Sequence, residues 1–144
     1  MLSRTAEYLY WISRYMERAE TTARLLDVGY RMSLFPNPSG YNNEWESVLS
    51  AAGAIDGYKN KYDTIEQKNV EDYLFFDESN PSSVYNCILN ARNNALVVRT
   101  SFTPESWLAI NKTYQEILNL KEKKFTKSDL PDLTEWTIEQ VNLF

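Results

Sequence analysis

The sequence predicts an all-α fold, a bundle of about five to six helices that begins with a long helix. Apolar residues recur at steps of three and four, and we see neither the alternation typical of strands nor an internal repeat. The 144 residues include only four glycines and five prolines, too few for a hairpin-rich fold. By length, residues 1–144 form a single domain with a substantial core.

The first predicted helix begins after Ser3, its cap, and runs to about Met32. Apolar and small residues share one arc, about a third of its circumference: Tyr8, Ile12, Tyr15, Met16, Ala19, Ala23, Leu26 and Tyr30. Four more large apolar residues lie on the charged side: Tyr10, Trp11, Leu25 and Val28. We therefore expect neighbouring elements to cover this helix on two faces.

Two helices are predicted in the middle of the chain. The stretch 35–40, FPNPSG, ends the first helix. Asn43 and Glu46 resemble a capping box, and the helix that they open continues through Ile55. A short third helix is predicted over residues 66–75.

Cap residues also open the last three predicted helices. Asn80 caps a fourth helix that ends near Thr100, and Thr103 caps a fifth. A capping box of Asp132 and Glu135 opens a sixth one residue later. The chain then ends on the apolar sequence VNLF without a stop signal, so we expect either a cut domain or a partner for that surface.

The composition excludes several classes of function. The chain has no histidine, which removes Ser-His and Cys-His nucleophiles, imidazole metal sites and the Glu-x-x-His pairs of carboxylate-bundle metal proteins. We therefore expect no metal and no cofactor. A net charge of −5 and a pI near 4.8 argue against nucleic-acid binding.

The cysteine content and the N-terminus bear on location. Cys87 is the lone cysteine, so the chain has no internal disulfide, and we expect this thiol to lie in the core. The N-terminus lacks an apolar signal core, and no stretch reaches the length of a membrane span. These features favour a cytoplasmic protein with no membrane contact.

Charged residues supply the candidate site, which we interpret as a binding or structural polar network. Arg92 and Arg99 fall within the apolar arc of the fourth helix, where a buried guanidinium requires an anion. We hypothesise ion pairs from Glu17 or Glu20 to these two arginines. The candidate residues are Glu7, Arg14, Glu17, Arg18, Glu20, Arg24, Arg92, Asn94 and Arg99.

Three alternatives stay open at this point. Glu20 and Arg24 have the i, i+4 spacing of a local surface pair. An arginine can also lay its stem on apolar surface while its head reaches water. Guanidinium groups gathered in a partly closed site would instead suit a carboxylate or phosphate ligand.

Three stretches of the chain resemble one family, the alpha-E proteins. Residues 2–28, LSRTAEYLYWISRYMERAETTARLLDV, are similar to the family's opening, and Glu17-Arg18 occupy its Glu-Arg motif. Residues 76–99 and 104–114 resemble its second signature, usually Ala-Arg-Glu-Asn-Ala-Arg. Here the signature reads ARNNAL, so Arg92, Asn94, Ala95 and the later Arg99 match, whereas Asn93 and Leu96 depart.

The resemblance carries expectations about length and function. Family members are longer, so we expect this chain to be the N-terminal half of the usual domain. Alpha-E proteins are bacterial and are encoded beside, or fused to, ATP-grasp proteins, which implies a setting of ATP-dependent peptide ligation. The chain would then be a non-catalytic partner of the ligase or of a related operon protein, or a homo-oligomer. The alternative is an enzyme or ligand-binding subunit whose Arg14, Arg18, Arg92 and Arg99 hold a carboxylate or phosphate.

Overall fold

The periodic apolar residues fold into helices along the described chain, residues 2–35, 43–122 and 130–142 of a computed structural model. Within these ranges there are seven α-helices and no strand, which confirms the all-α class and the long first helix. These seven helices exceed the five to six that the sequence predicted. The helices are α1 (Leu2–Ser33), α2 (Asn43–Ala51), α3 (Ile55–Lys61), α4 (Gln67–Phe75), α5 (Val84–Val97), α6 (Pro104–Glu122) and α7 (Leu130–Asn142), with a 3-10 turn η1 (Arg99–Ser101) after α5.

The predicted second helix is two helices because a glycine interrupts it. Gly53 has φ of 67°, a left-handed conformation that glycine adopts without steric penalty. Its N–H donates to the Ser50 carbonyl, and the Ala54 N–H donates to the Leu49 carbonyl. The chain therefore leaves α2 at Ala51 and enters α3 at a new angle.

Two predicted helix starts are wrong. The Asn80 side chain accepts from the Ser82 N–H and donates to the Tyr73 carbonyl, so it fixes the loop before the helix. Ser83 caps α5 instead, accepting from the Asn86 N–H. At the other end, α7 begins at Leu130, which places Asp132 inside its first turn rather than at the cap.

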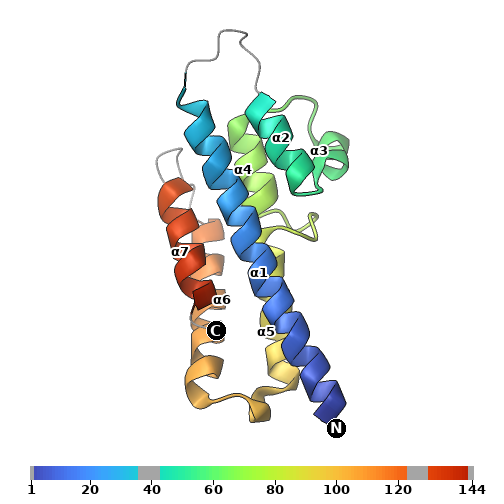
Figure 1. Cartoon of the computed structure of the whole chain (residues 1–144), viewed down its shortest axis with the longest axis vertical. Helices are drawn as coiled ribbons and strands as arrows, with labels where there is room; N and C mark the ends of the chain where they lie inside the picture. The colour runs from blue at the N-terminus through green and yellow to red at the C-terminus, as the bar shows by residue number, and fades with distance from the viewer. Residues whose placement is uncertain (1, 36–42, 123–129, 143–144) are drawn as a thin grey trace.

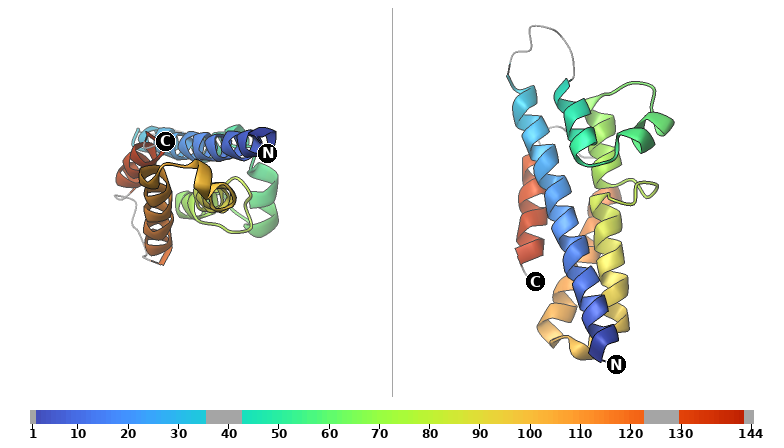
Figure 2. Two further views of the ribbon diagram at one scale, coloured as in Figure 1. Left: turned by 90° about the horizontal axis from the view of Figure 1, so that it is seen from below. Right: turned by 45° about the vertical axis from the view of Figure 1, so that its right-hand side comes forward.

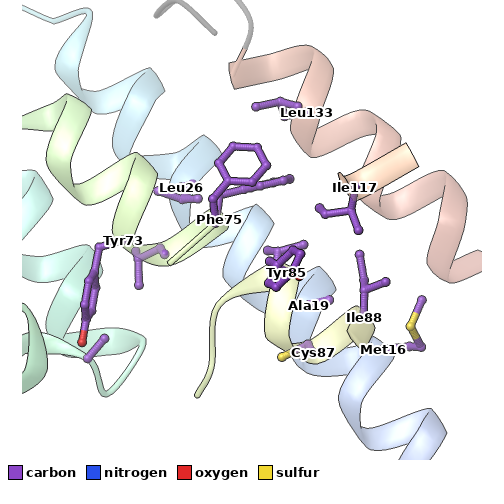
Figure 3. Packing of buried hydrophobic residues seen from close by; sticks show 14 of the residues in the cluster. Met16, Ala19, Leu26, Tyr73, Phe75, Tyr85, Cys87, Ile88, Ile117 and Leu133 are labelled. Carbon is purple, nitrogen blue, oxygen red and sulfur yellow. The ribbon is translucent and has the colours of Figure 1, made fainter. Parts of the chain in front are cut away.

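Helix α1 is the central element of the bundle (Figure 1). α5 runs antiparallel beside it, α7 lies along its middle, and α2 and α4 pack against its C-terminal half from the other side (Figures 1 and 2). α6 packs on α5, and the core fills the space between these helices. Figure 3 shows core residues from four helices: Met16 and Leu26 of α1, Phe75 of α4, Ile88 of α5 and Ile117 of α6.

The expectation that α1 is covered on two faces is wrong for three of its four residues. Tyr10, Trp11 and Val28 are 51%, 44% and 50% exposed, while Leu25 is half-buried. No helix in the part of the chain that the structure describes is long and apolar enough to cross a membrane.

Candidate functional site

A groove lies between the N-terminal half of α1 and the C-terminal half of α5, with a volume of about 340 Å³. Helical spacing explains how α1 builds it, because residues three and four apart share one flank of a helix. α5 contributes the side-chain amide of Asn94 from the opposite side of the groove. The lining residues are Arg4, Glu7, Tyr8, Trp11 and Tyr15 from α1 and Asn94 from α5.

Aromatic rings make up much of the groove wall. The Trp11 ring centroid lies 6.0 Å from that of Tyr15 and 5.4 Å from that of Tyr10, both in tilted arrangements. α5 exposes Leu96 and Val97 just beyond Asn94. This end of the bundle therefore exposes aromatic residues beside the groove on α1 and aliphatic residues on α5.

The groove also carries one acid and one base. Glu7 and Arg4 stand one turn apart on α1, and both line the groove. Neither forms an ion pair with the other or with any other described residue. Both charges are therefore available to a bound molecule.

The structure confirms local ion pairs on α1 in place of the hypothesised interhelical ones. Arg14 lies 3.6 Å from Glu17, and Arg24 lies 3.2 Å from Glu20, so each carboxylate has a partner within about one turn. Between described residues, neither Glu17 nor Glu20 forms an ion pair with an arginine of α5 or η1. The hypothesis is wrong because a same-helix partner is closer than any partner across the seam.

Arg92 satisfies its charge without an anion. Its Nε donates to Asn111 Oδ1 at 3.3 Å, and its guanidinium lies 5.1 Å from the centre of the Tyr114 ring. Both partners belong to α6, and Arg92 is half-buried between α5 and that helix. Arg99 is exposed on η1. The arginines of the candidate site are thus divided between the α1 flank and the α6 side of α5.

Arg18 is exposed on α1, and its positive charge acts on the buried thiol of Cys87 on α5. Burial raises the pKa of Cys87 to about 12, and the positive charge of Arg18 lowers it in part. The thiol is therefore protonated at neutral pH. Its core location is the one that the sequence predicted.

Among the described residues there is no group of three or more aspartates, glutamates or cysteines placed to hold a metal ion. Of the nine residues in the predicted polar network, the groove contains Glu7 and Asn94.

A family model described as "a predicted alpha-helical domain with a conserved ER motif", Alpha-E, matches residues 1–144. The chain belongs to the Alpha-E family. The match covers all 144 residues rather than an N-terminal part of them, and the expected shortening relative to the family stays a prediction. No curated protein and no solved structure matches the chain.

Glu17-Arg18 is the one Glu-Arg sequence in this Alpha-E chain. Glu17 pairs with Arg14 on the exposed side of α1, and the charge of Arg18 acts on Cys87 of α5. Two turns further along α5, Asn94 lines the groove. The motif thus lies on the same α1–α5 seam as the groove.

Sequence reasoning missed four residues of the groove. It assigned Tyr8 and Tyr15 to the core, placed Trp11 on a second covered face and gave Arg4 no role. The available signal was their spacing, because these residues fall at the border between the apolar arc and the charged side. When a neighbouring helix lies beside such a border, the residues at the border line the groove between the two helices.

Proposed function

We propose that this Alpha-E protein is a non-catalytic binding subunit that docks an ATP-grasp-type ligase of a peptide-ligation system on the α1–α5 face. The observation that supports the proposal is the groove with its exposed aromatic border. The identity of the partner follows from the family resemblance in the sequence.

The composition of this face suits a protein interface. Tyr10 and Trp11 are large, rigid and about half exposed, and Val97 is exposed on the facing helix. Tyrosine and tryptophan are enriched among residues that contribute most to interface affinity. Soluble monomers expose such apolar groups in clusters mainly where they bind a partner.

The chemistry of the chain supports a non-catalytic role. The chain has no histidine, and its one thiol has its pKa raised to about 12. The chain therefore offers neither an imidazole as a general base nor a thiolate as a nucleophile for group transfer.

Co-expression with the ATP-grasp protein encoded nearest to the gene, followed by affinity purification, tests the proposal. We expect stoichiometric co-purification, reduced at least about tenfold by Trp11→Ala. Leu108→Ala is the matched control, because Leu108 is 67% exposed but lies on α6. Far-UV circular dichroism shows whether each variant folds. A folded wild-type chain that never retains the ligase, or a Leu108→Ala variant as defective as Trp11→Ala, would overturn the proposal.

The alternative, an arginine site for a carboxylate or phosphate, would use Arg14 and Arg18 on α1, because Arg92 turns to α6. Thermal shift against inorganic phosphate and an acidic peptide tests it, since a ligand that binds the folded state raises Tm. No shift at millimolar ligand contradicts this alternative.

Homo-oligomerisation also stays a prediction, which light scattering of the purified chain tests.

A further inference from the structure

We propose that the groove binds a zwitterion of dipeptide size, with the ligand's ammonium at Glu7, its carboxylate at Arg4 and an apolar side chain on the rings. This inference rests on the proposed function, since it takes the α1–α5 face as a binding surface, and it names the class of small ligand held there beside the docked protein.

The first argument is the spacing of two opposite, unpaired charges. Residues three apart on a helix have Cβ atoms about 5–6 Å apart. At about 3.3–3.6 Å per residue, the charged ends of an extended dipeptide are separated by a similar distance. A free amino acid carries both charges on one carbon, so Arg4 and Glu7 suit the dipeptide better. A ligand with a single charge would be attracted by one of these two residues and repelled by the other.

The rings supply the second argument. Tyr8, Trp11 and Tyr15 line the groove beside Glu7. Trp11 and Tyr15 are inclined by 39° to each other with centroids 6.0 Å apart, so their faces are not stacked against each other. An ammonium is attracted to the face of an aromatic ring, and an aliphatic side chain packs well on it.

The third argument is the amide of Asn94, which reaches the groove from α5. Asn94 is half-buried, and it forms no hydrogen bond with another residue that the structure describes. A primary amide both donates and accepts, which matches the N–H and C=O of a peptide bond. It therefore complements the part of a dipeptide that lies between the two charged ends.

The size of the groove sets the scale of the ligand. A volume of about 340 Å³ lies at the small end of the range for ligand sites, about 300–1,000 Å³. Such a groove holds a molecule of a few residues at most and excludes a folded segment.

Calorimetric titration of the full chain with leucylglycine tests the inference. The change in tryptophan fluorescence that Trp11→Phe abolishes is a second readout, because the chain has three further tryptophans. We expect saturable binding that is weakened at least about tenfold when the peptide is N-acetylated or C-amidated, because each block removes one charge. Glu7→Gln and Arg4→Gln should each reduce affinity to the same degree. Glu17→Gln is the matched control, because Glu17 lies on the same helix but pairs with Arg14 away from the groove lining.

Three results would overturn the inference: no heat at millimolar leucylglycine, affinity unchanged by blocking either end, or free leucine binding as tightly as the dipeptide. The outcome is separable from that of the proposed function. If leucylglycine fails to bind while the ligase still co-purifies with the chain, the ligand assignment is wrong and the docking role stands. If leucylglycine binds and the ligase does not, the reverse holds.

Discussion

The two halves of α1 have similar sequence patterns and very different surroundings. In the C-terminal half, Ala19, Ala23 and Leu26 are fully buried. In the N-terminal half, Tyr10 and Trp11 are about half exposed beside the groove. Figure 1 shows that α2 and α4 lie along the C-terminal half and α7 along the middle of α1, whereas the N-terminal end extends past them with α5 beside it.

Specific contacts hold the neighbours to the C-terminal half. The Thr134 hydroxyl of α7 donates to the Ala23 carbonyl, and Gly29 lies against Trp45 and Val48 of α2. The burial of an apolar residue on α1 therefore depends both on the direction of its side chain and on the helices at its level, because Ile12 and Met16 are buried in the N-terminal half while Val28 is half exposed in the C-terminal half. The half without such neighbours retains exposed rings and unpaired charges for binding.

The largest predicted difference between the halves is in core stability. Leu26→Ala removes a fully buried side chain, and we expect the free energy of unfolding to fall by about 2–5 kcal/mol. Tyr10→Ala in the exposed half should change it by no more than about 0.5 kcal/mol. Urea denaturation measures both. Equal losses for the two variants would show that Tyr10 is packed as tightly as Leu26.

Gly29→Ala should reveal how tightly α2 packs on α1. An added Cβ would lie 2.7 Å from a ring carbon of the buried Trp45 and 2.9 Å from a methyl of Val48. Two contacts below 3.0 Å place the overpacking cost at about 2–3 kcal/mol, which outweighs the gain of about 1 kcal/mol in helix propensity, so we expect a net loss of about 1–2 kcal/mol.

Ser13→Ala in the exposed half is the matched control for that substitution. Ser13 is exposed, so only helix propensity changes, and stability should rise by a few tenths of a kcal/mol. A Gly29→Ala variant as stable as the wild type would mean that α2 shifts freely along α1.

Much of the fold could be predicted from the sequence because helical periodicity is a local signal. The bounds of α1 and α4 and the cap of α6 at Thr103 were all predicted closely. The break at Gly53 was not, because a glycine inside an apolar pattern is compatible with either a helix or a turn. Its conformation depends on how α3 packs, which the local pattern does not contain.

The candidate site was harder to predict. Glu7 was chosen as a candidate anion and Asn94 because it matches the family's second signature, and the groove contains both. The pairing of Glu17 and Glu20 with α5 failed, because a helical wheel gives the direction of a side chain but not the distance to the next helix. Trp11 was missed for a related reason: its exposure reflects where the neighbouring helices end.

The pH dependence of stability probes the boundary between the halves, where the charge of Arg18 acts on Cys87. The folded-state pKa of this thiol is about 12, against 9.0 for an ordinary thiol. The contribution of the thiol to the free energy of unfolding is therefore fully present below pH 9. It is lost as pH rises above 9, because the unfolded chain then binds fewer protons than the folded chain. Between pH 9 and 10 the slope should average about 1 kcal/mol per pH unit and rise toward the limit of about 1.4 at higher pH.

Cys87→Ala is the comparison, because it removes the titrating group while leaving the tyrosines in place. Burial also raises the pKa values of Tyr58 and Tyr73, whose contribution begins near pH 10 in both proteins. We expect a flatter profile for Cys87→Ala between pH 9 and 10, measured by urea denaturation at each pH. The same slope in both proteins would show that the thiol is not shielded from water.

The smallest predicted effect concerns the ion pairs along α1. A double-mutant cycle for Glu20 and Arg24 should give a coupling of about 0.3–0.5 kcal/mol that declines with added salt, as for exposed i, i+4 pairs. A cycle for Glu20 and Arg92 should give none, because Arg92 contacts Asn111 and Tyr114 on α6. Coupling between Glu20 and Arg92 that exceeds that of the local pair would instead mean that the network spans the α1–α5 seam. The charged side of α1 would then form ion pairs with α5 that stabilise the bundle. The groove would lie beside this ordered polar network instead of beside a solvated surface of α1.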